Sequence, residues 1–470
     1  MPGLRGMLFT RRSVLRMAAA GSAMLLAACQ PKVVEVEKVV KETVEVEKVI
    51  KETVVVETEK EKIIKETVAV PTERSKVVFW HAFGSGASRD HMDQFTSRYN
   101  IESSTYVAEP IFVDLWTLDQ KFTAAIAAGQ PPDAVTYTIG ASGLRAEAQQ
   151  IMSLSPYIAA DGFDVAGLVP YAAEALEYKG EIWGLPFQPD TRVLYYNKGQ
   201  FAEAGLDPET PPETWDDLWE FALKVDQIDA SGSLQRVGFS PMFGNVYVFP
   251  FLFANGAVPV SDAGEFNFQS PEIIETAYWY KQWADHYGHE ELLMFASGFG
   301  TEANDPFMSG LLSMIVQNNR YIGDLIKYAP ATEWGVGMIP HTGTPASQGA
   351  GYDLEVPKGA SNPDGAWDLI KAGMSREVQV GGAKLAGWLP SVMANAEDPS
   401  LADIPFWDVV VASAKVTQGR KFVLEAPSWF AFVVTAFEEV WDGLKTPEQA
   451  LADAQAAAEK EVENYHAARQ

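Results

Sequence analysis

The sequence predicts an α/β fold, because short apolar segments typical of strands alternate with longer segments of helical periodicity. The first unit contains a strand at 76–80 (KVVFW), a glycine-containing turn at 83–86, and helical patterning that continues through Tyr99. A second strand is expected at 104–108, followed by an amphipathic helix at 112–128. Strands and helices of these lengths point to a mostly parallel sheet covered by helices.

The same alternation continues after the turn GQPPD at 129–133, which ends the second helix. A strand at 134–137 follows that turn directly. In the second half of the chain, 312–316 is expected to be a strand and 363–374 a helix. The α/β pattern therefore extends through most of the chain.

The segment TWDDL at 214–218 has the pattern of a helix start. Thr214 can cap the helix, with Asp217 at the capping-box position, and Asp216 and Asp217 favour the positive end of the helix dipole. We therefore interpret Trp215 as a packing residue rather than a ligand contact.

Residues 1–28 have the pattern of an export signal. Four arginines precede an uncharged apolar run of about twelve residues, which is too short to cross a bilayer but suits a signal peptide. The segment TRRSVLR at 10–16 resembles a twin-arginine export signal, although the general export route stays open. LAAC at 26–29 resembles the lipobox of bacterial lipoproteins. Cys29 is the only cysteine, so we expect it to carry a lipid and expect no disulfide.

A charged, valine-rich repeat follows the signal. Residues 35–44 (EVEKVVKETV) recur almost unchanged at 45–54, and a shifted copy occupies 59–68. Ten residues shift a helical face by about 80°, whereas an even period preserves the faces of a strand. The many β-branched residues favour an extended spacer over a helix, with a reach on the order of 130 Å. Residues 29–75 are therefore expected to form a lipid-anchored spacer.

The rest of the chain has the composition of a globular body. Hydrophobic residues make up 47% of the sequence and aromatic residues 11%. Roughly 395 residues exceed what one hydrophobic core usually accommodates, so two domains are expected. The formal net charge of −27 argues against a nucleic-acid partner and against adsorption to anionic lipid. It also disfavours a strongly anionic ligand, unless a local basic pocket overrides the average.

A series of sequence blocks spans nearly all of residues 76–440. They are FTAAIAAGQPPDAV at 122–135, YKGEIWGLPFQPDTRVLYYN at 178–197, AGLDPETPPETWDDL at 204–218, and the segments 307–319, 334–340, 349–358 and 366–390. In this order the blocks resemble the extracellular solute-binding proteins of ATP-binding-cassette importers, specifically the large sugar-binding, maltose-binding-protein-like group.

This resemblance implies two α/β lobes joined by a hinge that the chain crosses several times. Lobe one is expected at 76–187 plus 350–389, and lobe two at 188–349 plus 390–470. A sugar or oligosaccharide would bind in the cleft at the carboxyl ends of the strands and stabilise the closed form, which the permease subunits then recognise. The resemblance implies a monomeric binding protein that catalyses no reaction and holds no cofactor or metal. The lipid on Cys29 would hold it at the outer face of the cytoplasmic membrane, in a periplasmic or extracellular location.

A pyranose presents C–H faces and a ring of hydroxyls, so its site needs flat aromatic rings and planar polar groups. We expect such residues at strand ends and in the segments that cross between lobes. The candidates are Trp80, His81, Tyr137, Gln188, Asp190, Tyr247, Asn318, Asn319, Tyr352, Asp353 and Trp388.

Tyr352 and Trp388 are the preferred stacking residues, and Trp429 is a weaker third. For Trp80 and His81, packing at the end of the strand is as open as contact with a ligand. For Asp190, a place in a solvated hinge turn is as open as contact with a ligand. Arg320, next to the candidate asparagines, would instead suit an anionic ligand.

Two other classes of protein stay open. An exported glycoside hydrolase would need two carboxyl groups roughly 5–10 Å apart, but no motif singles out a pair among the 63 acidic residues. The six histidines are scattered, and the chain lacks a Gly-x-Ser-x-Gly nucleophile motif. A surface carbohydrate adhesin or sensor on a stalk is the second alternative. The solute itself stays open too, since polyols and glycerol phosphate esters are bound within the same family.

Overall fold

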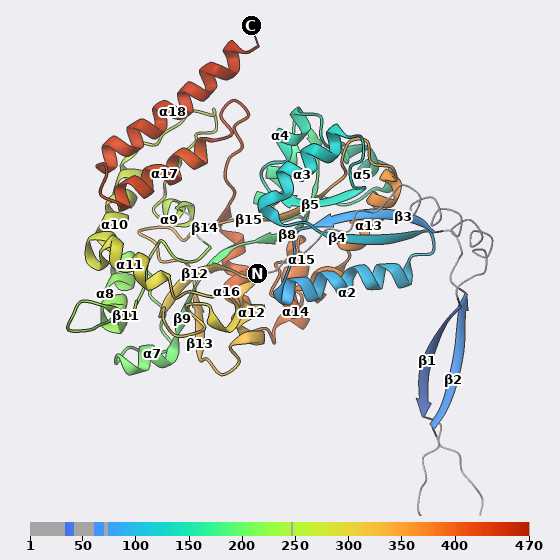
Figure 1. Cartoon of the computed structure of the whole chain (residues 1–470), viewed down its shortest axis with the longest axis horizontal. Helices are drawn as coiled ribbons and strands as arrows, with labels where there is room; N and C mark the ends of the chain where they lie inside the picture. The colour runs from blue at the N-terminus through green and yellow to red at the C-terminus, as the bar shows by residue number, and fades with distance from the viewer. Residues whose placement is uncertain (1–32, 42–60, 70–73, 246–247, 470) are drawn as a thin grey trace, which may run out of the picture. The chain divides into compact units, whose positions relative to one another are not determined.

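The computed structural model describes residues 33–41, 61–69, 74–245 and 248–469 (Figure 1). The chain divides into two compact units, 1–75 and 76–470. Among the described helices, none is long and apolar enough to span a membrane.

The first unit contains two strands, β1 (Val33–Lys41) and β2 (Glu61–Ala69). They pair antiparallel, with Val33 opposite Ala69 and Lys41 opposite Glu61. The preference for strand over helix is therefore confirmed in the described part of the repeat. The expected reach of a fully extended spacer is wrong, because the chain folds back and pairs with itself.

The second unit contains a five-stranded sheet in the order β4-β3-β5-β15-β8. Its strands are β3 (Ser75–His81), β4 (Tyr106–Phe112), β5 (Ala134–Thr138), β8 (Leu185–Asp190) and β15 (Ala350–Glu355). β3 and β5 are parallel, whereas β15 is antiparallel to both β5 and β8. The expectation of a mostly parallel sheet is wrong, because β15 arrives from the other sheet and not through a helical crossover.

The two faces of this sheet carry different helices, as the alternation of side chains along a strand requires. Val77 and Phe79 of β3 belong to the cluster that includes α2 (Gly86–Glu102), α13 (Pro363–Gly373) and α14 (Arg376–Ala386). Val135 and Tyr137 of β5 belong to the cluster that includes α3 (Leu115–Ala127) and α4 (Ser142–Glu147). Figure 1 shows α2 on one side of the sheet and α3 and α4 on the other.

A three-stranded sheet, in the order β12-β9-β13, organises the other half of this unit. Its strands are β9 (Arg192–Asn197), β12 (Met314–Asn318) and β13 (Trp334–Gly337), and both outer strands are antiparallel to β9. A large apolar cluster surrounds it. The helices that contribute to this cluster include α8 (Trp215–Val225), α9 (Phe249–Ala254), α10 (Pro271–Tyr287), α12 (Tyr321–Tyr328), α17 (Trp429–Trp441) and α18 (Pro447–Ala467).

The predicted start of α8 is confirmed. Thr214 and Asp217 form a complete capping box, in which each side chain accepts from the backbone N–H of the other residue. Trp215 is buried and stacks on Trp279 with ring centroids 4.5 Å apart, so it packs as expected.

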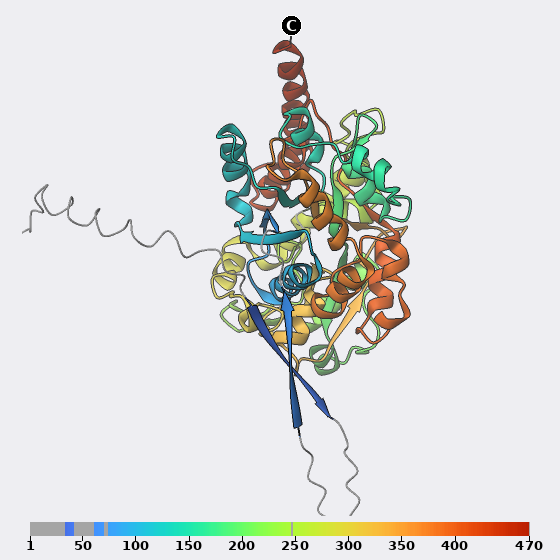
Figure 2. The same ribbon diagram turned by 90° about the vertical axis from the view of Figure 1, so that its right-hand side faces the viewer.

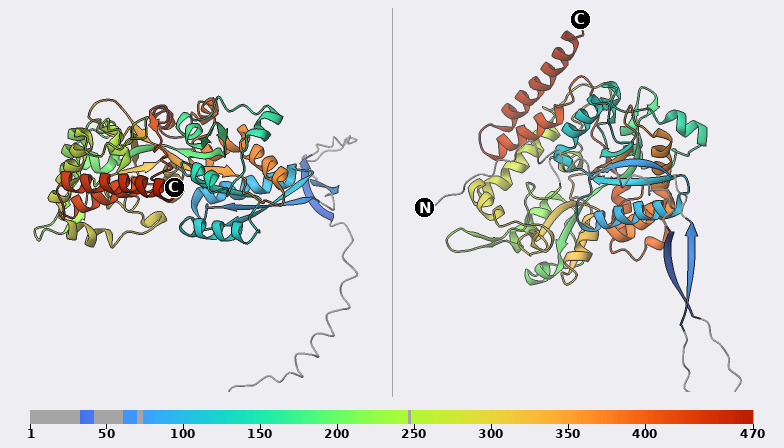
Figure 3. Two further views of the ribbon diagram at one scale, coloured as in Figure 1. Left: turned by 90° about the horizontal axis from the view of Figure 1, so that it is seen from above. Right: turned by 45° about the vertical axis from the view of Figure 1, so that its right-hand side comes forward.

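Shorter elements connect the two sheets, and the last turns of α18 extend beyond α17 to the C-terminus (Figures 2 and 3). The remaining described elements are α5 (Ser155–Asp161), α6 (Pro170–Leu176), β6 (Glu177–Tyr178), β7 (Glu181–Ile182), α7 (Lys198–Glu203), β10 (Gln227–Ile228), β11 (Leu234–Arg236), α11 (His289–Ala296), η1 (Glu302–Asn304), β14 (Ser347–Gln348), α15 (Met393–Ala396), η2 (Pro399–Leu401), α16 (Trp407–Lys415) and β16 (Thr417–Gln418).

Candidate functional site between the two sheets

The chain passes between the two sheets where β8 continues into β9 at Thr191, and where β14 continues into β15 at Gly349. Thr191 lies at the centre of a buried hydroxyl cluster. Its Oγ1 lies 3.1 Å from the hydroxyl of Ser347, 2.7 Å from that of Ser413 and 2.6 Å from that of Thr417. The two crossings are therefore bonded to each other and to the end of α16.

Asn319 fixes the same crossing from the end of β12. Its side-chain oxygen accepts from the Thr191 N–H at 2.9 Å, and its amide donates to the Gly387 carbonyl at 2.6 Å. Gly387 ends α14, so Asn319 joins three segments that are distant in sequence. Both ends of this buried side chain are thus already bonded to protein.

An ion pair lies beside the hydroxyl cluster. Arg192 donates through Nη1 to the carboxylate of Asp190, and its Nη2 donates to Asn245 Oδ1 at 2.9 Å. The same Asp190 carboxylate accepts from the Ala350 N–H at 2.8 Å. Because Asp190 and Arg192 are both buried, this geometry makes Asp190 a bridge between the two crossings.

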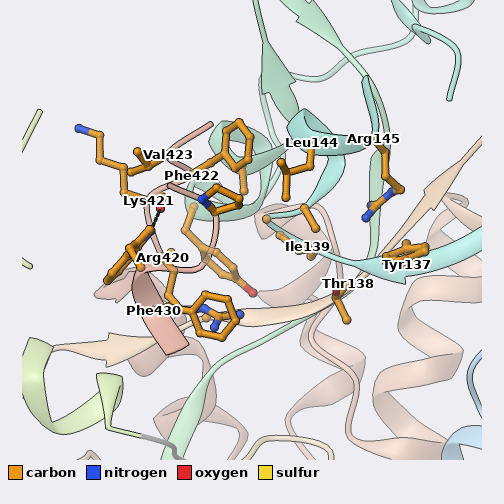
Figure 4. A pocket seen from close by; sticks show the side chains of 18 of the residues that line it. Tyr137, Thr138, Ile139, Leu144, Arg145, Arg420, Lys421, Phe422, Val423 and Phe430 are labelled. Atoms are coloured by element: carbon orange, nitrogen blue, oxygen red, sulfur yellow. Dashed lines mark hydrogen bonds between the residues drawn. The ribbon is translucent and has the colours of Figure 1, made fainter. Parts of the chain in front are cut away.

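A cavity of about 460 Å³ opens next to these crossings (Figure 4). The end of β5 and helix α4 form one wall, and residues 419–423 together with the start of α17 form the opposite wall. Figure 4 shows Tyr137, Leu144 and Arg145 on one side, and Lys421, Phe422 and Phe430 on the other. The lining residues include Asp119, Tyr137, Thr138, Ile139, Leu144, Arg145, Gln150, Tyr171, Arg420, Lys421, Phe422, Trp429 and Phe430.

One wall of the cavity rests on a buried charge cluster. Arg145 donates to both carboxylate oxygens of Glu355, at 2.7 and 2.5 Å, and its guanidinium carbon lies 3.5 Å from the centre of the Tyr137 ring. Asp353 accepts from the Tyr137 N–H at 3.1 Å, and its other oxygen lies 4.0 Å from Arg145. Burial, reinforced by the charge of Glu355, raises the pKa of Asp353 well above its usual range. These bonds hold the Tyr137 ring in place at the cavity.

The opposite wall is aromatic and basic. The Arg420 guanidinium carbon lies 4.5 Å from the centre of the Phe430 ring, and the Trp429 indole donates to the Lys421 carbonyl at 3.1 Å. Lys421 itself donates to the Ser261 carbonyl at 2.7 Å. This wall therefore offers the aromatic face of Phe430 with the Arg420 guanidinium beside it.

Comparison with known proteins identifies the family. A sequence profile described as bacterial extracellular solute-binding protein matches residues 93–405, well over half of the chain. The chain belongs to this family of solute-binding proteins. The sn-glycerol-3-phosphate-binding periplasmic protein UgpB of Escherichia coli K12 is 26% identical over 426 residues, which cover 80% of this chain and 90% of that protein.

Solved structures of binding proteins agree with the family. CpMnBP1 with mannotriose bound is 28% identical, with a TM-score of 0.75, and the match covers 82% of this chain and 100% of that one. Maltose-bound MalE3 from T. maritima is 19% identical, with a TM-score of 0.70 and coverage of 82% and 99%. The solute-binding body therefore has the two-lobed α/β fold of these proteins, as expected.

Three of the expected site residues, His81, Tyr352 and Trp388, lie in or around an aromatic cluster at the end of β3. Phe83 lies 4.9 Å from both Tyr352 and Trp388 and 6.4 Å from His81, measured between ring centroids. Burial lowers the pKa of His81 to about 4, so the imidazole is neutral near pH 7. Trp388 is buried against His91 and Phe187 as well, whereas Tyr352 is only partly buried.

The two preferred stacking residues, Trp388 and Tyr352, differ in burial. The faces of Trp388 contact protein, and its indole donates to Ser88 at 2.9 Å, so this geometry does not favour stacking on a ligand. Tyr352 is only partly buried, and the centre of its ring lies 6.0 Å from the Arg320 guanidinium carbon. Ligand contact stays a prediction for both.

The other expected residues divide between scaffold and cavity. Trp80 is half-buried against the cluster beneath α3, and Asn318 accepts at its carbonyl from the Tyr195 hydroxyl at 3.1 Å. Tyr137 lines the cavity, whereas Asp353 lies beneath it. Tyr247 lies outside the described residues. Ligand contact stays a prediction for Trp80, His81, Tyr137, Gln188, Asp190, Tyr247, Asn318, Asn319 and Asp353.

Sequence reasoning missed most of the wall at 419–430, of which only Trp429 was considered. The signal was the pairing of basic and aromatic residues in RKF at 420–422 and WF at 429–430.

Among the described residues, several buried polar atoms near the crossings have no protein partner. They are the Tyr137 hydroxyl, one side-chain oxygen each of Gln188 and Gln348, the second carboxylate oxygen of Asp353, and Arg320 Nε. Since buried polar atoms are nearly always hydrogen-bonded, these five atoms retain bonding capacity, which together with the neighbouring cavity makes the region between the sheets the candidate binding site.

Proposed function

We propose that this chain is the extracytoplasmic solute-binding component of an ATP-binding-cassette importer. In this proposal a sugar or oligosaccharide binds between the lobes and is delivered to the permease subunits. The cavity carries the proposal, since its walls come from both sides of the crossings and present aromatic rings beside a few polar groups. Its volume of about 460 Å³ lies in the range of small-molecule sites.

The proposed mechanism is binding coupled to closure. A ligand that contacts Tyr137 on one wall and Phe430 on the other gains affinity only when both walls are in reach, so it favours the closed form. The bonded crossings at Thr191 would then serve as the hinge. Lobe limits of 76–187 plus 350–389 and 188–349 plus 390–470 belong to this proposal.

Sugars suit this cavity better than small anions. Phe422 and Phe430 offer apolar faces that complement the C–H faces of a pyranose. The structure described as mannotriose-bound supports this class of ligand. The UgpB relative and the guanidinium of Arg420 in the cavity wall support a glycerol phosphate ester as the second candidate.

The location belongs to the proposal as well. We propose export through the signal at 1–28, by the twin-arginine or the general route, and lipidation of Cys29 at the outer face of the cytoplasmic membrane. Globomycin, which blocks lipoprotein signal peptidase, should cause the precursor to accumulate, and Cys29→Ser should release the protein from membranes. A Cys29→Ser protein that stays in the membrane fraction would contradict lipid anchoring.

Calorimetric titration of the purified protein tests the solute. The panel contains mannobiose, mannotriose, maltose and glycerol 3-phosphate, and chromatography of the recovered ligand detects any turnover. We expect saturable binding of a saccharide without product formation. Phe430→Ala should weaken it by about two- to tenfold, through the loss of a ring contact. Leu444→Ala, which removes an exposed apolar side chain outside the cavity, is the matched control.

The other outcomes separate the alternatives. Binding of glycerol 3-phosphate alone would replace the sugar by the phosphate ester. Product formation would favour a glycoside hydrolase, and binding of no solute would favour an adhesin or sensor. Asp353 and Glu355 are poor candidates for hydrolytic acids, because Arg145 and the Tyr137 N–H already bind these buried carboxyls.

A further inference from the structure

Trp116 is unusual among the tryptophans of this chain. It lies in the first turn of α3 and is 83% exposed, whereas Leu118 and Phe122 of the same helix are buried. Two apolar residues shortly before it, Ile111 and Phe112, are 42% and 44% exposed. Several large apolar side chains exposed close together mark an interaction site more often than one exposed side chain alone does.

The position of Trp116 connects it to the cavity. Asp119 lines the cavity and follows Trp116 by three residues, so both side chains lie on neighbouring parts of one helix face. The Asp114 side chain caps α3 by accepting from the Trp116 N–H at 3.1 Å, which fixes the start of the helix.

The end of α3 that carries Trp116 also faces the binding edge. The helix begins three residues after β4 ends at Phe112, so its first turn lies at the carboxyl end of that strand. Ligands of α/β sheets bind outside these ends. Trp116 therefore lies at this edge, three residues before the cavity residue Asp119.

We propose that Trp116 forms an outer subsite, in which its ring stacks on a sugar unit of an oligosaccharide whose inner units occupy the cavity. This inference rests on the proposed sugar-binding function and narrows it to ligands longer than the cavity holds. A tryptophan face suits the C–H face of a pyranose, and its contact adds affinity only when the ligand reaches that far. Glycerol phosphate is too short to use the subsite.

A chain-length series tests the subsite. The affinities of mannose through mannotetraose, and of glucose and maltose through maltotetraose, are measured by calorimetry for the wild type and for Trp116→Ala. We expect the wild type to gain affinity as units are added. Trp116→Ala should lose about two- to tenfold for the longer ligands and leave the shortest ligand that binds unchanged. Trp116→Tyr should restore most of the loss.

The matched control is Ile101→Ala. Ile101 is 84% exposed but lies in the last turn of α2, at the end of that helix remote from the carboxyl end of β3. It should leave every affinity unchanged. Tryptophan emission provides a second measurement, because a longer ligand should protect Trp116 from acrylamide quenching and this protection should be absent in Trp116→Phe.

Each other result overturns the subsite. If saccharides bind but Trp116→Ala leaves the gain with length intact, the proposed function stands and the inference fails. An equal loss for all lengths would make Trp116 part of the inner site or of the scaffold. If no saccharide binds to the wild type, both proposals fail. If only stimulation of the permease ATPase is lost, the surface contacts the importer instead.

Discussion

Replacing Arg145 by methionine should strongly destabilise the compact unit formed by residues 76–470. One buried guanidinium faces two buried carboxyls, with two hydrogen bonds to Glu355 and a distance of 4.0 Å to Asp353. Arg145→Met removes the only cation that contacts these acids in the described structure and leaves both without compensation. Breaking a buried pair in this way costs about 3–5 kcal/mol. The contact with the Tyr137 ring adds to the loss.

The opposite truncation should cost less. In Glu355→Met the guanidinium keeps Asp353 as its partner, so one cation still faces one acid. The double variant Arg145→Met/Glu355→Met removes both charged groups of the pair and replaces them by side chains of similar volume. Its loss should be smaller than the sum of the single losses, because apolar replacement of a buried pair is often nearly neutral.

Urea unfolding followed by tryptophan fluorescence and by circular dichroism measures these differences. The deficit of Arg145→Met should also grow with pH. The pKa of Asp353 is already raised by burial and by Glu355, and loss of Arg145 removes the opposing effect. Asp353 then takes up a proton on folding. The free energy of unfolding therefore falls as the pH rises above the pKa of Asp353 in the unfolded chain, by up to about 1.4 kcal/mol per pH unit. An Arg145→Met loss below about 1 kcal/mol, or strict additivity of the double variant, would refute this reasoning.

Three further predictions address single groups. Asp353→Asn should flatten the fall of stability above about pH 4, since folding no longer binds a proton there, whereas the exposed control Asp403→Asn should keep the wild-type profile in urea unfolding. Tyr137→Phe removes a buried hydroxyl without a described partner, so thermal melting should show unchanged or higher stability. Calorimetry should show ligand affinity about two- to tenfold lower. Unchanged affinity would exclude a hydrogen bond from this hydroxyl to the ligand. Thr214→Ala should cost about 1 kcal/mol by loss of the α8 cap, and Thr214→Ser should recover most of it; equal stability of both variants would contradict the role of the cap.

Local elements were predictable because their signals are local. The capping box at Thr214 and the turn before β5 depend on residues within one or two turns of chain, and both elements form where expected. The mixed direction of the five-stranded sheet was not predictable from spacing. β15 joins β5 and β8 after the chain has built the whole three-stranded sheet, so its direction depends on contacts more than 150 residues apart.

The candidate site was only partly predictable for the same reason. Tyr137, selected because it ends a strand, lines the cavity, and its contact with a ligand stays a prediction. The same rule selected Asp190 and Asn319, which are used in bonds that hold the crossings together. Whether a polar side chain faces solute or spans a crossing depends on its partners, and these come from distant segments. The loop at 420–430 was missed because it follows no strand of either main sheet.

Strand β15 connects the crossing to the cavity. It begins one residue after Gly349, and its first residue donates to Asp190. Gly351 has a φ of 106°, and a Cβ there would collide with the Gln188 carbonyl, so this part of the strand packs tightly on β8. Five residues after its start the strand carries Glu355, which holds Arg145 and through it the Tyr137 ring. A continuous series of contacts therefore runs along one short strand from the crossing to the wall of the cavity. In the proposed function, closure of the lobes around a solute would use these contacts to couple the cavity to the crossing.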